Sequence, residues 1–221
     1  YSIRFVPELK YSRTKWHLTA GAAIYYDADE KTVPWPQLTF DYALSGKNLH
    51  IFVGSKLRVE ANHLHRITAE NPWLNPNLPK LSNFLGKEIY GGVRGEGHIL
   101  GYELAGGYVN GRNWDQFNNL TIQSNASAFF TDLNAIFFRS SVDFAISNKV
   151  ILSGSLIKNF FDKNGATHLY GLHTFECKAQ AQIKFWNGKV QLTPELFVTD
   201  RSWTQIEKNP GIVTDIRLNN R

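Results

Sequence analysis

Residues 173–200, HTFECKAQAQIKFWNGKVQLTPELFVTD, contain the pattern from which the fold of this chain can be inferred. Apolar and polar side chains alternate along a first arm, and the same alternation returns along a second arm after Asn187-Gly188. A β-strand points successive side chains to opposite faces, so each arm predicts a strand with one apolar and one charged face. Asn-Gly tolerates the positive φ angles of a tight type I′ hairpin, which predicts two antiparallel neighbours.

The length of these arms separates a membrane strand from an ordinary one. Each arm alternates for ten residues or more, whereas strands average about five or six residues and a tilted strand crossing a bilayer needs about nine to eleven. Trp16 and Tyr26 share a face ten residues apart in another such segment. At about 3.3 Å per residue and a tilt near 40°, they would lie roughly 25 Å apart, which is the height of an outer-membrane apolar band. We therefore predict an all-β, antiparallel, up-and-down transmembrane β-barrel.

Composition narrows the class of protein further. The chain has 221 residues, of which 43% are hydrophobic, and it contains 15 Phe, 9 Tyr and 6 Trp, enough for aromatic girdles. No apolar run reaches the roughly 18 residues of a transmembrane helix, which excludes a helical membrane protein. The net charge is +5, but basic and acidic residues alternate along the strands instead of forming a patch, so we expect no nucleic-acid partner. The single cysteine, Cys177, falls in an apolar row, where we expect it to face lipid.

The same alternation places about eleven or twelve strands along the chain, separated by connections that are short and long in turn. Such an alternation is typical of barrels with tight periplasmic turns and longer extracellular loops. We expect the main loops at 27–35, 62–86, 111–131, 162–172 and 201–211, with an extended, strand-paired arm within 111–131. We expect crossings at 2–11, 15–26, 36–45, 49–61, 87–97, 99–110, 132–146, 150–161, along both arms of 173–200, and from Ile212 onward. Single-chain bacterial barrels usually close with an even number of strands, so we interpret residues 1–221 as one barrel domain that lacks at least one strand.

Several segments resemble the TonB-dependent-receptor-like barrels of Bacteroidetes outer membranes. They are Glu70–Pro76 with its Asn-Pro-Trp-Leu sequence, Val93–Gly97 through Gly106-Gly107-Tyr108, Val142–Lys149 and Asp215–Asn219. The resemblance implies a barrel in the bacterial outer membrane, in contact with membrane lipid and lipopolysaccharide, with other outer-membrane or periplasmic proteins as partners. No segment resembles a plug domain or an N-terminal TonB-contacting region. A passive pore and a membrane subunit of a larger complex therefore both remain open.

The charged rows of the predicted strands are the candidate functional surface. An unpaired Lys or Arg that faces lipid at the midplane costs about 2–4 kcal/mol, so these rows are expected to face the lumen. They describe either a polar pore or a cross-strand network of ion pairs that fills the barrel. The predicted lumen-lining residues are Lys56, Arg58, Glu60, Arg94, Glu96, Arg139, Asp143, Glu176, Lys178, Lys184 and Glu195.

Catalytic and metal-binding patterns are weak. Asp27 and Asp29 suggest a solvated loop more than an acidic protease pair, and His63 and His65 share a face without a third ligand nearby. Neither Ser153 nor Ser155 has a base beside it that the sequence identifies, although a nucleophile needs one. We expect no catalytic residue, no cofactor, no metal and no enzymatic activity. A transport-type barrel is the first hypothesis. A plugged structural or interaction barrel, an outer-membrane hydrolase and a soluble β-sandwich are the alternatives.

Overall fold

The computed structural model describes residues 2–27, 30–45, 48–60, 83–118, 127–162, 169–170, 172–186, 189–200, 203–209 and 212–217. Every long element in these ranges is a β-strand, as the alternation predicts. No helix in this part of the chain is long and apolar enough to cross a membrane. The strands are β1 (Ser2–Phe5), β2 (Glu8–Ser12), β3 (Trp16–Asp27), β4 (Glu30–Ser45), β5 (Leu49–Glu60), β6 (Phe84–Glu96), β7 (Leu100–Asn118), β8 (Ser127–Ser147), β9 (Val150–Asp162), β10 (Phe175–Phe185), β11 (Val190–Leu192), β12 (Glu195–Thr199), β13 (Trp203–Asn209) and β14 (Ile212–Arg217).

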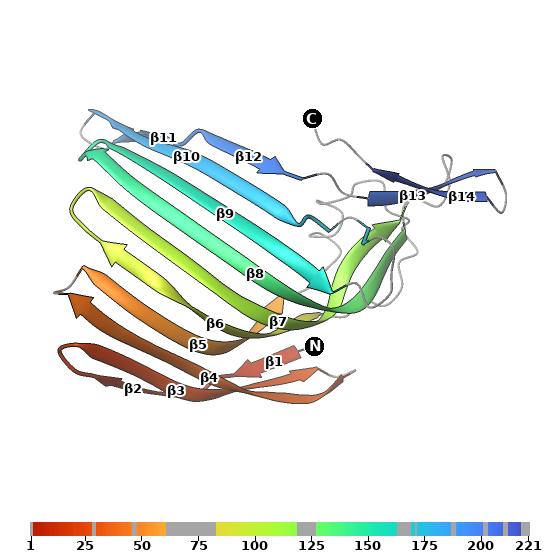
Figure 1. The fold of residues 1–221 in the computed structure, drawn as a ribbon, viewed down its shortest axis with the longest axis horizontal. Helices are drawn as coiled ribbons and strands as arrows, with labels where there is room; N and C mark the ends of the chain where they lie inside the picture. The colour runs from red at the N-terminus through yellow and green to blue at the C-terminus, as the bar shows by residue number, and fades with distance from the viewer. Residues whose placement is uncertain are drawn as a thin grey trace.

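Twelve of these strands form one antiparallel, up-and-down sheet, and from β3 to β10 chain neighbours are also sheet neighbours. At the edges, β1 and β2 both pair with β3, and β11 and β12 both pair with β10. Figure 1 shows them side by side in chain order, from the red N-terminal strands to the blue strands β10–β12. The sheet is curved, and its first and last strands do not pair with each other within the described residues. The arrangement confirms the predicted antiparallel, up-and-down order.

The two faces of the sheet differ in the way that the sequence predicts. On one face the apolar rows stay exposed, as Ile136, Phe138 and Phe144 of β8 show with exposed fractions of 61%, 42% and 43%. The register places Tyr108 and Phe160 beside Ile136 on the same face. Cys177 also lies there, between Leu156 and Val198. The apolar rows are therefore not packed against one another around a dry centre.

Prolines explain where the edges of this sheet are broken. The expected strand 2–11 is divided into β1 and β2 at Val6-Pro7, and the second arm of the hairpin is divided into β11 and β12 at Thr193-Pro194. Proline has no N–H to donate to a ladder, so it is tolerated at edges and interruptions. The strands β5 to β10, which have neighbours on both sides, contain no proline.

The expected loop 27–35 is wrong, because this stretch belongs to a strand that contains prolines where it has a neighbour on one side only. The strand β4 begins at Glu30 and pairs with β3 through Pro34 and Pro36. Its pairing with β5 ends at Leu38 and Ser55, so both prolines lie on a stretch whose other side is unpaired. Beyond that point, Ala23 and Tyr25 of the β3–β4 hairpin pack against Leu57 and Leu85 of β5 and β6 in a buried cluster.

The two longest strands, β7 and β8, extend into the region 111–131, which we expected to be mainly a loop with a strand-paired arm. Residues 114–118 of β7 pair with 127–131 of β8, past a bulge at which Asn113 has a φ of 57°. The arm is thus strand-paired, and residues 111–118 and 127–131 belong to β7 and β8. A strand begins at Ile212, as expected, but this strand, β14, pairs with β13 in a separate hairpin instead of joining the main sheet. The expected loop 201–211 is wrong, because β13 occupies Trp203–Asn209. Most of the expected loops 62–86 and 162–172 lies outside the described residues.

Candidate functional site

The charged side chains named in the sequence lie on one face of the sheet. Cross-strand pairing places these side chains on the same face of β5, β6, β7, β8, β9, β10 and β12. The exposed apolar rows lie on the opposite face. Two pockets open on the charged face, so it is the concave one. The structure places on it Lys56, Arg58, Glu60, Arg94, Glu96, Arg139, Asp143, Glu176, Lys178, Lys184 and Glu195. Lys178 and Glu195 form an ion pair at 3.1 Å, and Arg58 pairs with Glu60.

Glu88 on β6 is the centre of a charge cluster that the sequence analysis did not single out. Its side chain is fully buried, with an exposed fraction of 0%. Lys56 Nζ lies 3.3 Å from one carboxylate oxygen, while Arg139 Nη2 at 3.3 Å and Arg58 Nη1 at 3.6 Å approach the other. Buried charges need partners of opposite sign, and here one carboxylate ties together strands β5, β6 and β8. Glu88 is an even number of residues away from Arg94 and Glu96 on the same strand, so the alternation could have identified it as part of the charged row.

A second carboxylate, Asp41 on β4, is buried nearby with an exposed fraction of 4%. Arg94 Nη2 donates to Asp41 Oδ2 at 2.6 Å, and His50 Nδ1 lies 2.6 Å from Oδ1. The three residues come from β4, β5 and β6, so this contact continues the cross-strand network toward the N-terminal edge. Charge-assisted hydrogen bonds of this length are among the strong ones in proteins.

Aromatic rings lie beneath these cations and over glycines of neighbouring strands. A Cβ added to Gly92 would meet Phe52 Cζ at 2.8 Å, and one added to Gly107 would meet Phe137 Cζ at 2.7 Å. Arg94 lies 5.8 Å from the Phe52 ring centroid, and Arg139 lies 4.1 Å from that of Phe137. The same stacking joins Gly54, Tyr90 and Lys56. The glycines therefore give the rings room to lie flat, and the rings support the charged groups.

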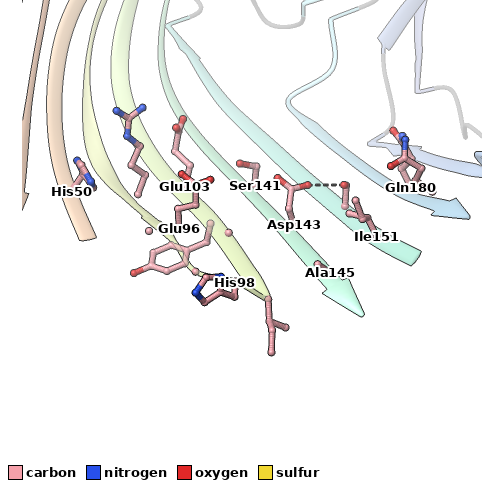
Figure 2. A pocket seen from close by; sticks show the side chains of 17 residues that line it. His50, Glu96, His98, Glu103, Ser141, Asp143, Ala145, Ile151 and Gln180 are labelled. Carbon is pink, nitrogen blue, oxygen red and sulfur yellow. Dashed lines mark hydrogen bonds between the residues drawn. The ribbon is translucent and has the colours of Figure 1, made fainter. Parts of the chain in front are cut away.

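Toward the β6–β7 turn the concave face opens into a pocket of about 840 Å³. Figure 2 shows Glu96, Glu103 and Asp143 around it, from β6, β7 and β8, with Gln180 of β10 at its far side. Asp143 accepts a hydrogen bond from the Ser153 hydroxyl at 2.6 Å. A smaller pocket of about 240 Å³, which shares Arg94 and Glu103 with the first, continues toward Lys56 and Arg139.

The weaker candidates gain no chemistry from the structure. His63, His65 and Asp29 lie outside the described residues. In the part of the chain that is described, no group of three or more His, Cys, Asp and Glu side chains could hold a metal ion. Ser153 donates its hydroxyl to Asp143, and Ser155 lies opposite Ser141 and Lys178. The absence of a catalytic site stays a prediction.

Comparison with known proteins identifies the fold. No protein family model matches this sequence, and no curated protein matches it in sequence. Solved structures do match in shape. The copper transporter OprC has a TM-score of 0.53 at 11% identity, covering 88% of this chain and 33% of that chain. The structure of the FpvAI–pyocin S2 complex has a TM-score of 0.58 at 10% identity, covering 95% and 30%. A structure of P. aeruginosa FpvA bound to heterologous pyoverdines has the same TM-score of 0.58, identity of 10% and coverage of 95% and 30%.

OprC and FpvA are TonB-dependent receptor barrels, so this chain has the strand arrangement of that class of outer-membrane β-barrel. It spans about a third of the length of the solved chains that it matches.

Proposed function

We propose that this chain forms part of a transport-type β-barrel of the bacterial outer membrane, with its apolar face toward lipid and its charged face toward the lumen. The observation that carries the proposal is the separation of exposed apolar rows and ionised rows onto opposite faces of a receptor-like sheet. Soluble monomers rarely expose apolar patches of more than a few hundred Å². Membrane lipid is the partner that such a surface requires, and we propose lipopolysaccharide as a second one.

Other parts of the proposal rest on the sequence. The Bacteroidetes type is carried by the sequence motifs, of which Glu70–Pro76 lies outside the described residues. We also propose that the chain belongs to a larger complex with other outer-membrane or periplasmic proteins. Residues 1–221 are proposed to form one barrel domain, and this domain to have no enzymatic activity. The ligands named for FpvAI, FpvA and OprC belong to those proteins, and the charged face by itself selects none of them.

A filled, structural barrel is the second candidate, and the Glu88 cluster favours it. One fully buried carboxylate with three cations holds β5, β6 and β8 together. Such a network stiffens the concave face whether or not solutes pass over it. Ion conductance across planar bilayers separates the two candidates, because an open lumen conducts and a filled one does not.

The orientation of the faces is tested by nitroxide labels in lipid vesicles. Cys177 is first replaced by Ser, and single cysteines are then introduced at Phe138 and Ser155, which lie on opposite faces. We expect the label at 138 to collide with dissolved oxygen, which concentrates in lipid. The label at 155 should collide with a water-soluble nickel chelate. The reverse pattern, or equal exposure of both labels to the chelate, would overturn the proposed location.

A further inference from the structure

The contact between Asp41, His50 and Arg94 contains a group whose charge depends on pH. Asp41 is buried, and each of its carboxylate oxygens is approached at 2.6 Å, one by Arg94 Nη2 and the other by His50 Nδ1. An ionised carboxylate only accepts hydrogen bonds, so Nδ1 of a neutral His50 carries the proton in this contact. Histidine ordinarily gains its charge between pH 8 and pH 5. Protonation of His50 would therefore place a second cation on a carboxylate that already holds Arg94.

The register gives Arg94 a second carboxylate within reach. Arg94 lies directly opposite His50 on β5 and directly opposite Glu103 on β7. To reach Asp41 it extends across the ring of Phe52, whose centroid is 5.8 Å from the guanidinium carbon. Its side chain is 50% exposed, so Arg94 has room to change partner. Glu103 is exposed as well, and it forms no ion pair with any residue that the structure describes.

The charges around His50 favour such a change once the imidazole is protonated. Like charges directly opposite each other on paired strands are destabilising, and a protonated His50 would face Arg94 in this way. Two cations would then share Asp41, while Glu103 would have none. Beyond Asp41, the imidazole of His17 on β3 lies opposite this carboxylate, with Nδ1 2.9 Å from Ser12 Oγ. The other titratable and charged groups around His50 are Arg94 and Glu96 of β6, His98 of the β6–β7 turn, Glu103 of β7 and Asp143 of β8.

We propose that protonation of His50 moves Arg94 from Asp41 to Glu103, so that the concave face contains a pH-sensitive switch. Each carboxylate then holds one cation, and the repulsion across the β5–β6 pair is relieved. Arg94 and Glu103 line both pockets of the concave face. Their ion pair would lie where the two pockets adjoin and would narrow the passage between them. The inference goes beyond transport, because the rearrangement concerns the concave face whether or not solutes pass over it.

The test measures the charge beside Ser141, which lies directly opposite Glu103. The parent for this test carries Cys177→Ser and Ser141→Cys in the full chain, folded in detergent micelles at about 0.15 M salt, where the Debye length is about 8 Å. The thiol at position 141 is modified with an anionic and with a cationic methanethiosulfonate at each pH. The ratio of the two rates reports the local charge, because the fraction of thiolate affects both rates equally.

Three replacements are compared in this parent. His50→Gln removes the titrating group and keeps an amide that can donate to Asp41. Glu103→Gln removes the proposed second partner, and its exposed side chain lets the fold tolerate the change. His98→Gln is the matched control, because it removes another histidine of the same pocket. Circular dichroism checks that every variant keeps the β-sheet signal of the parent.

We expect the ratio of the anionic to the cationic rate to rise about two- to fourfold between about pH 8 and about pH 6, because the arriving guanidinium offsets the charge of Glu103. The rise should persist in His98→Gln and disappear in His50→Gln and in Glu103→Gln. A constant ratio in the parent, a rise that persists in either test variant, or a rise that is lost in the control would each overturn the inference. A chain that shows the switch but does not conduct ions would contradict transport alone, so the two proposals fail separately.

Discussion

The replacement Glu88→Gln gives the most informative measurement on this fold, because it removes the buried carboxylate and keeps the shape of the side chain. Lys56, Arg58 and Arg139 would then lie around a neutral amide, 3.3 to 3.6 Å from where the charge was. At an effective dielectric constant of about 20, opposite charges 4 Å apart attract by about 4 kcal/mol. Three such attractions give an upper bound that desolvation and screening reduce strongly.

The reduction follows from exposure. The side chains of Lys56, Arg58 and Arg139 are 38%, 37% and 30% exposed, whereas that of Glu88 is 0% exposed. Water therefore solvates the cations again once the carboxylate is gone, and burying that carboxylate already costs several kcal/mol. Breaking a buried pair from one side typically costs about 3–5 kcal/mol. We expect Glu88→Gln to lower the free energy of unfolding by about 2–4 kcal/mol, because these cations remain partly wet.

The assay is urea unfolding of the chain in micelles, followed by tryptophan fluorescence and extrapolated linearly to zero denaturant. Glu96→Gln on the same strand is the control and should change stability by no more than about 0.5 kcal/mol, because its side chain is exposed. Adding Arg139→Gln to Glu88→Gln should show a coupling of about 1–3 kcal/mol. If Glu88→Gln costs no more than Glu96→Gln, the cluster does not hold the three strands together.

Three further changes test other features of the fold. Gly107→Ala would place its Cβ 2.3 Å from a neighbouring backbone carbonyl oxygen and should cost about 1–3 kcal/mol in the same unfolding assay, whereas Gly101→Ala, whose nearest atom is at 3.8 Å, should cost little. Phe138→Arg should destabilise the protein in lipid vesicles by about 2–4 kcal/mol, and Ser155→Arg on the concave face should not; equal costs would contradict the assignment of faces. Lys184→Glu should shift the ion selectivity of any conductance toward cations, and reversal potentials that do not move would remove this residue from the ion path.

Alternation alone predicted the two faces, because the period of two is a local property of each strand. It placed Cys177 in an apolar row, and the register sets Cys177 between Leu156 and Val198. It placed Lys178 on the opposite, charged face, where Lys178 forms an ion pair with Glu195. It failed for the start of β4, which we expected at Pro36 after a loop at 27–35 and which lies at Glu30. A strand tolerates Pro34 and Pro36 there because β4 has no partner on its other side in that stretch.

The charge network itself could not be predicted, because it depends on which residues of distant strands meet. Parity places Glu88 on the charged face, but nothing local distinguishes it from Glu96, eight residues later on the same strand. The register makes the difference: Lys56 lies opposite Glu88, whereas the residue opposite Glu96 is Gly101. One carboxylate therefore becomes buried among cations, and the other remains in an open pocket.

In the proposed barrel, this division would also determine which charges can act on a solute. Arg58 and Arg139 are held by Glu88, and Arg94 by Asp41, so their fields are largely cancelled by fixed partners. The potential that an ion meets along the concave face then comes mainly from charges without partners in the described structure, such as Glu96 and Glu103. Replacing Lys56 and Arg58 with Glu would place carboxylates against Glu88 and disrupt the cluster. A change in ion selectivity could then not be assigned to the charges themselves. Lys184 forms no ion pair within the described part of the chain, so it is the better probe of the proposed lumen.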